Sequence, residues 1–396
     1  MSSLPAQLGP QRPTVSEVET FPLEHILESP YGTAKGRIPA RIGTLVKITT
    51  SEGFVGWGES FGPPRFVAPA LEAFSRALVG QPIDIRENFA QRIIAENYHL
   101  SIGGSHIAAL SGIDIALWDA QARTLGVPIG HLLGGVIRTE VPAYASIGYV
   151  TENADIDDFR AQLASAAAEG FQAAKIKIGI DPVADRQRAE AALAELGPHG
   201  ELMVDYNANG TVDSVMRSLR GLLDLDPRWV EEPLPPYQHD GWERVRELGV
   251  PLAGGEALYG RFGFREPIAN GHFDIIQPDA AKCGGLTEAK LISQLAYTFN
   301  RRVSPHCWGT GVAQAACLQL LSTLPDLPFG EFGGTPQFFE FDRGLNPLRE
   351  GVLAEPILPA NGTVAIPSGP GLGVEVDAEW ARFHRVEGLF THVASK

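Results

Sequence analysis

Short apolar segments that each end in a polar or charged residue recur through the middle of the chain. The ends fall at Lys177, Asp205, Glu231, Glu256, Asp279 and His306. Successive ends are 28, 26, 25, 23 and 27 residues apart, which is the length that one strand, one helix and two loops need. Six such units favour a (β/α)8 barrel, because the carboxyl ends of its strands meet at one face. An open doubly wound sheet is the alternative, but most of these side chains would then lie far apart.

Segments between these strand ends carry apolar residues three and four positions apart, which predicts helices. The segments are 181–197, 212–225 and 285–300. VPAYASIG at 141–148 is expected to be the first barrel strand, and QFFEFD at 337–342 the last. The pattern therefore predicts an α/β fold in which residues 138–345 form a modified TIM barrel.

The N-terminal part has strands followed by helices, and this order predicts an α+β domain over residues 14–137. RIGTLVKITTSEGFVGWGES is expected to form a hairpin that turns at Glu52 and Gly53. Helices are expected at 67–79, 86–97 and 105–125. Residues 1–13 have little to bury and are expected to be a disordered leader. Residues 346–396 are expected to pack back on the N-terminal domain.

Composition narrows the range of partners. The 396 residues carry a formal charge of −15 and a pI near 5.1, so we expect neither nucleic acid nor an anionic membrane as a partner. No apolar run approaches the roughly 18 residues of a membrane helix. Three cysteines and the lack of a secretory leader indicate a reduced, cytoplasmic protein. An anionic chain can still bind an anionic substrate where a metal and lysines reverse the local field.

Three carboxylates end three successive predicted strands, so their tips can converge on one point. They are Asp205, Glu231 and Glu256. Oxygen ligands without Cys or His favour Mg2+ over Zn2+. For any one of these carboxylates, an ion pair with a neighbouring lysine is an equal alternative, but three in sequence favour the metal site.

Lys175 and Lys177 alternate on one predicted strand, so both point to the same face. If that face is the barrel interior, two ammonium groups lie near a metal. This crowding should lower the pKa of at least one lysine toward neutrality and make it usable as a base. The alternative is a pair of solvated lysines on the outside of the barrel.

Asp279 and His306 end the next two predicted strands. A carboxylate beside an imidazole fixes its tautomer and supports its charged form, which makes the pair a second proton-transfer unit. The alternative for His306 is a hydrogen-bonded core histidine. Bases on two sides of a bound substrate suit removal of the proton next to a carboxylate, with Mg2+ and Lys175 stabilising the enediolate. A carboxylic acid on the last strand is expected to donate a hydrogen bond to the same oxygen.

Six motifs follow one another through the predicted barrel: KIKIG, VDYNANG, WVEEP, GGE, QPDAAKCGG and SPHCWGTG. In this order, with GWGES and SGIDIALWD upstream, they resemble the enolase superfamily, mandelate racemase subgroup. The resemblance implies a capping domain over the barrel and a magnesium cofactor. Its implied metal ligands are Asp205, Glu231 and Glu256. Its implied catalytic residues are Lys177 as one base, Lys175 beside the substrate carboxylate, and Asp279 with His306 as the opposing dyad.

The resemblance also implies that an early loop, near residues 27–37, shapes specificity. The candidate substrate-binding residues are Tyr31 in that loop, Asn207 and Trp308.

The last-strand acid has two candidates. Glu340 lies in QFFEFD and Glu331 in FGEFG. The sequence context favours Glu340, whereas the 25-residue period favours Glu331. We choose Glu340 and treat residues 326–336 as an inserted loop.

Within the subgroup, the motifs look most like those of acid-sugar dehydratases and galactarolactone cycloisomerases. We therefore expect a small anionic hydroxy acid as substrate. We also expect a homo-oligomer, and the resemblance to the family suggests an octamer. A racemase or epimerase would use the same residues with reprotonation from the other face. A metal hydrolase on the same barrel would need a His-x-His pair on the first strand. This chain has Tyr144, Ala145 and Ser146 there, which argues against a hydrolase. The alternative from another class is an inactive barrel that serves as a binding module, although every expected base and ligand is present.

Overall fold

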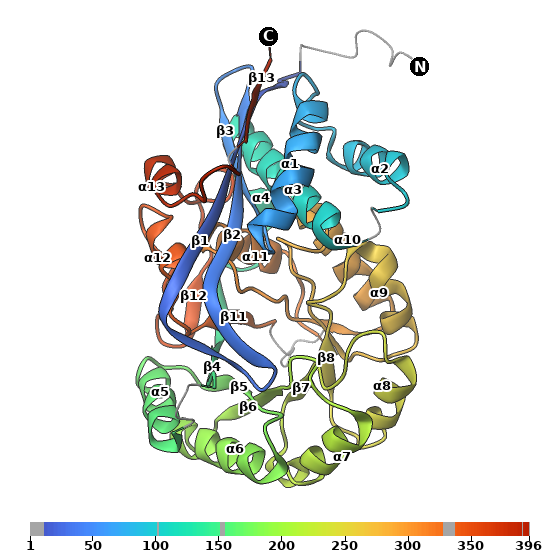
Figure 1. Cartoon of the computed structure of the whole chain (residues 1–396), viewed down its shortest axis with the longest axis vertical. Helices are drawn as coiled ribbons and strands as arrows, with labels where there is room; N and C mark the ends of the chain where they lie inside the picture. The colour runs from blue at the N-terminus through green and yellow to red at the C-terminus, as the bar shows by residue number, and fades with distance from the viewer. Residues whose placement is uncertain (1–11, 101–102, 151–154, 328–336, 390, 396) are drawn as a thin grey trace.

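The computed structural model of this chain describes residues 12–100, 103–150, 155–327, 337–389 and 391–395. The predicted leader, 1–13, therefore lies almost entirely outside the described residues. Figure 1 shows an antiparallel sheet with helices at one end of the molecule and a ring of β/α units at the other.

A four-stranded antiparallel sheet in the order β13-β1-β2-β3 forms the N-terminal unit. Its strands are β1 (Val15–Thr33), β2 (Gly36–Thr50), β3 (Val55–Ser60) and, from the tail, β13 (Thr391–Ala394). Residues 51–54 join β2 to β3, so the predicted hairpin is confirmed. The long β1–β2 hairpin reaches down to the barrel (Figure 1), where Gly32 N donates to Val150 O at 2.9 Å.

Three helices accompany this sheet: the first and third pack on it and on each other, and the second packs on the third. They are α1 (Pro64–Leu78), α2 (Arg86–Glu96) and α3 (Gly104–Leu125), which confirms the predicted helices to within three residues. α3 is buried along most of its length and ends at Gly126, whose φ of +68° suits glycine. A side chain at Gly58 of β3 would collide with Gly112 O of α3. Glycine at that position therefore lets the strand and the helix approach closely.

Eight parallel strands form the second unit, in the order β10-β9-β8-β7-β6-β5-β4-β11. Their bounds are β4 (Glu140–Ile147), β5 (Ala173–Lys177), β6 (Glu201–Asp205), β7 (Trp229–Glu231), β8 (Leu252–Gly254), β9 (Ile275–Ile276), β10 (Arg302–Val303) and β11 (Phe339–Asp342). The helices that follow α3 are α4 (Ile129–Leu132), α5 (Ile156–Ala168), α6 (Pro182–Leu196), α7 (Val212–Arg220), α8 (His239–Arg246), α9 (Gly260–Ala269), α10 (Gly285–Thr298) and α11 (Gly311–Leu321).

Side chains complete the barrel where β10 and β11 face each other. Gln337 Oε1 accepts from Val303 N at 3.3 Å, and Ser304 Oγ donates to Phe338 O at 3.2 Å. Large side chains fill the interior below the mouth, as a barrel core requires; these include Tyr144, Met203, Trp229, Ile275 and Phe338. The predicted modified barrel with an N-terminal α+β unit is confirmed.

The structure differs from the sequence-based expectation in two details. The helix predicted over 212–225 ends at Arg220, since Gly221 follows it and Leu223–Leu225 form a separate 3-10 turn, η1. The tail contacts both units: β13 pairs with β1, whereas β12 (Thr363–Ala365) pairs with β4 of the barrel. The two short tail helices are α12 (Pro347–Gly351) and α13 (Ala378–Phe383). Among the described residues, no helix combines the length and apolarity that crossing a bilayer would need.

Asp119 on α3 joins the N-terminal unit to the tail. Its carboxylate is fully buried and accepts from Trp57 N at 2.8 Å and Leu372 N at 2.7 Å. Arg123 Nε lies 3.2 Å from the same carboxylate. A side chain at Gly371, where φ is +74°, would collide with Asp119, which explains a glycine at this point of the tail.

Replacing Asp119 with alanine is expected to lower the free energy of unfolding by about 3 kcal/mol, because two buried backbone N–H groups lose their acceptor and the partly buried guanidinium of Arg123 loses one of its carboxylate partners. Urea denaturation followed by circular dichroism measures the change. Glu72→Ala is the control, since it removes an exposed pair with Arg76 and should cost less than about 1 kcal/mol. Equal losses in the two variants would contradict this account.

Candidate active site

A cavity of about 440 Å³ lies between the β1–β2 hairpin and the carboxyl ends of the barrel strands. Its barrel side is lined by Tyr149, Lys177, Asn207, Glu256, His306, Trp308 and Glu340. Its other side comes from the N-terminal unit and includes Glu24, Thr33, Arg37, Ile38, Ile42 and Phe61. Lys35 Nζ donates to Asn207 O at 3.3 Å, which ties the hairpin to the barrel mouth.

Ten of the eleven residues singled out from the sequence meet at this cavity or directly behind its lining. Those in the lining are Lys177, His306, Glu340, Glu256, Asn207 and Trp308. Those behind it, in contact with the lining or with one another, are Lys175, Asp205, Glu231 and Asp279. The strand register explains the grouping, since Lys177 lies beside Asp205, and Asp205 beside Glu231.

Both lysines of β5 point into the barrel and pair with carboxylates. Lys177 Nζ lies 2.5 Å from Asp205 Oδ2. Lys175 Nζ bonds Glu231 and lies 2.7 Å from Glu340 Oε1 and 3.9 Å from Asp205 Oδ2. The alternative of two solvated lysines on the outer surface is therefore excluded.

The pKa values of these lysines move in the direction opposite to the prediction. Burial disfavours the ammonium form of Lys177, but the nearby carboxylates Asp205, Glu231 and Glu256 together outweigh it and raise the lysine's pKa. Burial likewise opposes the charge on Lys175, whose pKa Glu231 and Glu340 hold well above its usual range. The sequence-based expectation counted a metal beside the lysines and omitted the carboxylates that pair with them.

His306 and Asp279 form the expected dyad. His306 Nδ1 lies 2.7 Å from Asp279 Oδ2, and Ala281 N donates to Asp279 Oδ1 at 2.8 Å. A carboxylate only accepts, so Nδ1 carries the proton and Nε2 faces Glu256 Oε2 at 3.4 Å. Burial opposes the charged imidazole, but Glu256, Glu340 and Asp279 together raise the pKa of His306 to about 10.

Glu340 on β11 is buried and acts as an acceptor. Its carboxylate accepts from Cys307 N at 3.2 Å and pairs with Lys175. Burial favours the neutral form, but Lys175 and then His306 outweigh it and lower the pKa of Glu340 to about 2. The prediction that this residue donates a hydrogen bond as a neutral acid is therefore wrong for this arrangement. The other candidate, Glu331, lies outside the described residues.

The three predicted ligands provide a donor set of oxygens only. Within the part of the chain that the structure describes, no group of three His, Cys, Asp or Glu donors already converges on one point, because the two lysines of β5 hold Asp205 and Glu231. Burial, opposed by Lys175 and reinforced by Asp205, raises the pKa of Glu231 to about 7. A bound cation would stabilise the neighbouring buried carboxylates Asp205 and Glu231 in their charged forms.

Two buried amide oxygens beside these carboxylates also support a site for a cation. Asn207 Nδ2 donates to Asp205 Oδ2 at 3.2 Å, and Gln277 Nε2 to Glu231 Oε2 at 2.6 Å. Among the described residues, Asn207 Oδ1 and Gln277 Oε1 have no hydrogen-bond partner. The residues present therefore fit a hard divalent cation such as Mg2+.

Trp308 and Tyr149 form one wall of the cavity. Trp308 Nε1 donates to Tyr149 OH at 2.7 Å, and Tyr149 OH donates to Asp342 Oδ1 at 2.7 Å. Arg41 from β2 stacks over the Trp308 ring at 4.0 Å and pairs with Asp342 at 2.8 Å. The wall is thus held by groups from both units.

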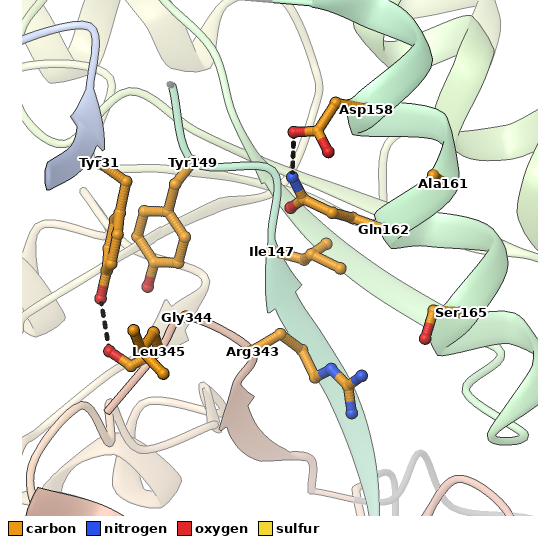
Figure 2. A pocket seen from close by; sticks show the side chains of 10 residues that line it. All are labelled: Tyr31, Ile147, Tyr149, Asp158, Ala161, Gln162, Ser165, Arg343, Gly344 and Leu345. Atoms are coloured by element: carbon orange, nitrogen blue, oxygen red, sulfur yellow. Dashed lines mark hydrogen bonds between the residues drawn. The ribbon is translucent and has the colours of Figure 1, made fainter. Parts of the chain in front are cut away.

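Tyr31 is the candidate that the structure places elsewhere. Its ring packs on Tyr149, with centroids 4.7 Å apart, and its hydroxyl donates to Leu345 O at 3.2 Å (Figure 2). It lines a separate cavity of about 450 Å³ that also contains Gln162 and Arg343. Tyr31 therefore supports the wall from behind and does not line the main cavity.

Sequence reasoning missed several lining residues, among them the aromatic residues Tyr149 and Phe61. Tyr149 lies two residues beyond β4, so the rule applied to the other strand ends would have found it. Phe61 follows β3, and its ring meets those of His306 and Trp308 edge-on at 6.3 and 6.1 Å. No local signal identifies Phe61, because its place depends on how the two units dock.

Family models cover most of the chain. Residues 16–134 match the N-terminal domain of mandelate racemase and muconate lactonizing enzyme, and residues 158–380 match a model described as enolase C-terminal domain-like.

Named relatives extend over nearly the whole length. The chain is 39% identical to D-galactarolactone cycloisomerase of Agrobacterium fabrum, over 92% of this chain and 97% of that protein. It is 32% identical to D-galactonate dehydratase of Variovorax paradoxus, over 85% and 89%. The crystal structure of 3,6-anhydro-D-galactonate cycloisomerase from Zobellia galactanivorans superposes with a TM-score of 0.84 at 30% identity, over 95% of this chain and 100% of that one.

Proposed function

We propose a reaction for this chain from its membership of the mandelate racemase and muconate lactonizing enzyme family of the enolase superfamily, of which it is an enzyme. In this proposal the chain removes the proton α to the carboxylate of a sugar acid or sugar-acid lactone. Loss of an oxygen leaving group from the β carbon follows, which gives dehydration or cycloisomerisation. The names of the relatives support this substrate class.

The observation that carries the proposal is the placement of two proton-transfer groups across one cavity. Lys177 ends β5, and His306 follows β10, with β6 to β9 between them on one side and β4 and β11 on the other. Carboxylates occupy the space between these groups, on the strands that separate them. A substrate in the cavity would thus face a base on one flank and an acid on the other.

We propose Mg2+ as the cofactor, with Asp205, Glu231 and Glu256 as its ligands. Enolase-superfamily sites pair Lys or His bases with magnesium. The cation would supply positive charge at the carboxylate oxygen where charge develops. Lys175 and Gln277 hold Glu231 in place from below.

Residues of the chain itself carry out the two proton transfers and cover the cavity. Lys177 takes the α proton in its neutral amine form, which its pairing with Asp205 disfavours until that pairing is relieved. His306 protonates the departing β oxygen with Nε2, while Asp279 holds Nδ1 and so fixes the tautomer. The β1–β2 hairpin covers the cavity and limits the access of water to the reacting carbon.

Deuterium exchange tests the proposal. Sugar mono- and diacids and their lactones are incubated with the protein and Mg2+ in heavy water and followed by proton NMR. Exchange at the α carbon together with a dehydrated or cycloisomerised product supports the proposal. An epimer as the product would favour the racemase instead, and no exchange across the panel would favour the binding module.

The expected homo-oligomer stays a prediction that light scattering tests.

Replacing Glu256 with glutamine is expected to weaken Mg2+ binding by roughly 10- to 100-fold, because one charged oxygen ligand is lost. Isothermal titration with MgCl2 measures the affinity. Glu24→Gln is the matched control, since Glu24 lines the same cavity from β1 and should leave the affinity unchanged. An unchanged Kd in Glu256→Gln would place the ligand elsewhere.

A further inference from the structure

Glu59, at the end of β3, is a fully buried carboxylate that reaches from the N-terminal unit into the barrel. It accepts from Thr310 N at 2.9 Å, from Thr310 Oγ1 at 2.6 Å and from Ala313 N at 3.0 Å. All three donors belong to the N-cap and first turn of α11. Among the described residues, no Lys or Arg forms an ion pair with Glu59, so the positive end of this helix is its main counter-charge.

The segment that precedes α11 carries His306 and Trp308. These residues lie four and two positions before Thr310, in a stretch without regular structure between β10 and α11. Gly309 leaves room for the Glu59 carboxylate, which a side chain at that position would closely approach. Glu59 therefore fixes the downstream end of the segment that presents His306 to the cavity.

Phe61, two residues after Glu59, contacts the segment that carries Asp279, the other residue of the dyad. Its backbone N donates to Ala281 O at 2.8 Å, and Ala281 N in turn donates to Asp279 Oδ1. The Phe61 ring meets the His306 ring edge-on. One strand end thus contacts both of the segments that bear Asp279 and His306.

We infer that the end of β3, through Glu59, positions the Asp279–His306 dyad, so that docking of the N-terminal unit sets the geometry of the acid on one flank of the substrate. Glu59 is a positioning residue, because it is not among the residues that line the cavity. Its charge matters as well as its shape: all of its partners donate, so an amide at this position would turn an NH2 group toward a backbone N–H. The inference rests on the proposed function for its kinetic readout.

The test compares Glu59→Gln with Asp119→Asn. Asp119 is an equally buried carboxylate of the same unit that also accepts backbone N–H groups, but it faces the tail and not the dyad. For each variant, α-carbon deuterium exchange and product formation are measured side by side on a substrate of the wild-type protein. In Glu59→Gln we expect kcat for product to fall by roughly 10- to 100-fold with KM changed less than about threefold, as a displacement near 1 Å would cause.

The ratio of exchange to product distinguishes positioning from stability. Exchange through Lys177 should persist in Glu59→Gln, so the ratio should rise, whereas Asp119→Asn should leave the ratio at the wild-type value. A crystal structure of Glu59→Gln should show a lengthened His306 Nδ1 to Asp279 Oδ2 distance, and this readout needs no substrate. An unchanged ratio with an unchanged distance would overturn the inference. A wild-type protein that shows neither exchange nor product would instead overturn the proposed function.

A second pair of variants covers the case in which Glu59→Gln does not fold. Thr310→Val removes the hydroxyl that donates to Glu59 at 2.6 Å, and Thr310→Ser keeps it. We expect a raised exchange-to-product ratio in Thr310→Val and the wild-type ratio in Thr310→Ser. Equal ratios in these two variants would overturn the inference.

Discussion

Replacing His306 with asparagine is expected to lower kcat for product formation by about 10³- to 10⁴-fold, at the upper range of general acid catalysis. His306 Nε2 faces the cavity, and Asp279 holds Nδ1 at 2.7 Å, so no other imidazole among the described lining residues can replace it. Exchange of the α proton through Lys177 should survive, because that step does not need the acid. Product formation and exchange are both followed by proton NMR.

Asp279→Asn is the companion variant. It keeps the shape but removes the charge that orients the imidazole, so we expect a smaller loss, roughly 10- to 100-fold. Thermal unfolding of both variants should stay close to that of the wild type. Near-normal product formation in His306→Asn would remove this residue from the mechanism.

Replacing Lys177 with methionine is expected to abolish both exchange and product formation, by about 10⁴-fold or more, since the base on its flank is lost. Methionine keeps most of the side-chain volume and removes the ammonium group. The loss of exchange is the decisive measurement, because His306→Asn should leave exchange in place. The two variants therefore separate the base from the acid.

Lys47→Met is the matched control for Lys177→Met. Lys47 is a largely buried lysine that pairs with Glu19 within the N-terminal sheet, far along the chain from the barrel. Its removal costs some stability but should leave exchange at the wild-type rate. Persistent exchange in Lys177→Met would show that another group takes the proton.

Much of the site follows from local order in the sequence. A period near 25 residues, with a charged side chain at each strand end, predicts a barrel and a common face for those side chains. The alternation of Lys175 and Lys177 predicts that they share that face, and both do point inward. The carboxyl ends of parallel strands meet whatever the details of packing, so these inferences need no tertiary information.

Other features depended on contacts between distant parts of the chain. The direction of the lysine pKa shifts and the ionised state of Glu340 follow from which carboxylates face which ammonium groups. The place of Tyr31 behind Tyr149 follows from how the hairpin docks on the barrel.

The strands, most helix bounds and the residue types at the strand ends could be predicted from local order, because they depend on neighbours within a few tens of residues. The surroundings of each charge could not be predicted in this way, because they come from distant parts of the chain. Glu59 and Thr310 are 251 residues apart in the chain, and their hydrogen bond exists because two separately recognisable units dock at one place. Burial and pairing set the energy of a charged group, and both are properties of the assembled fold.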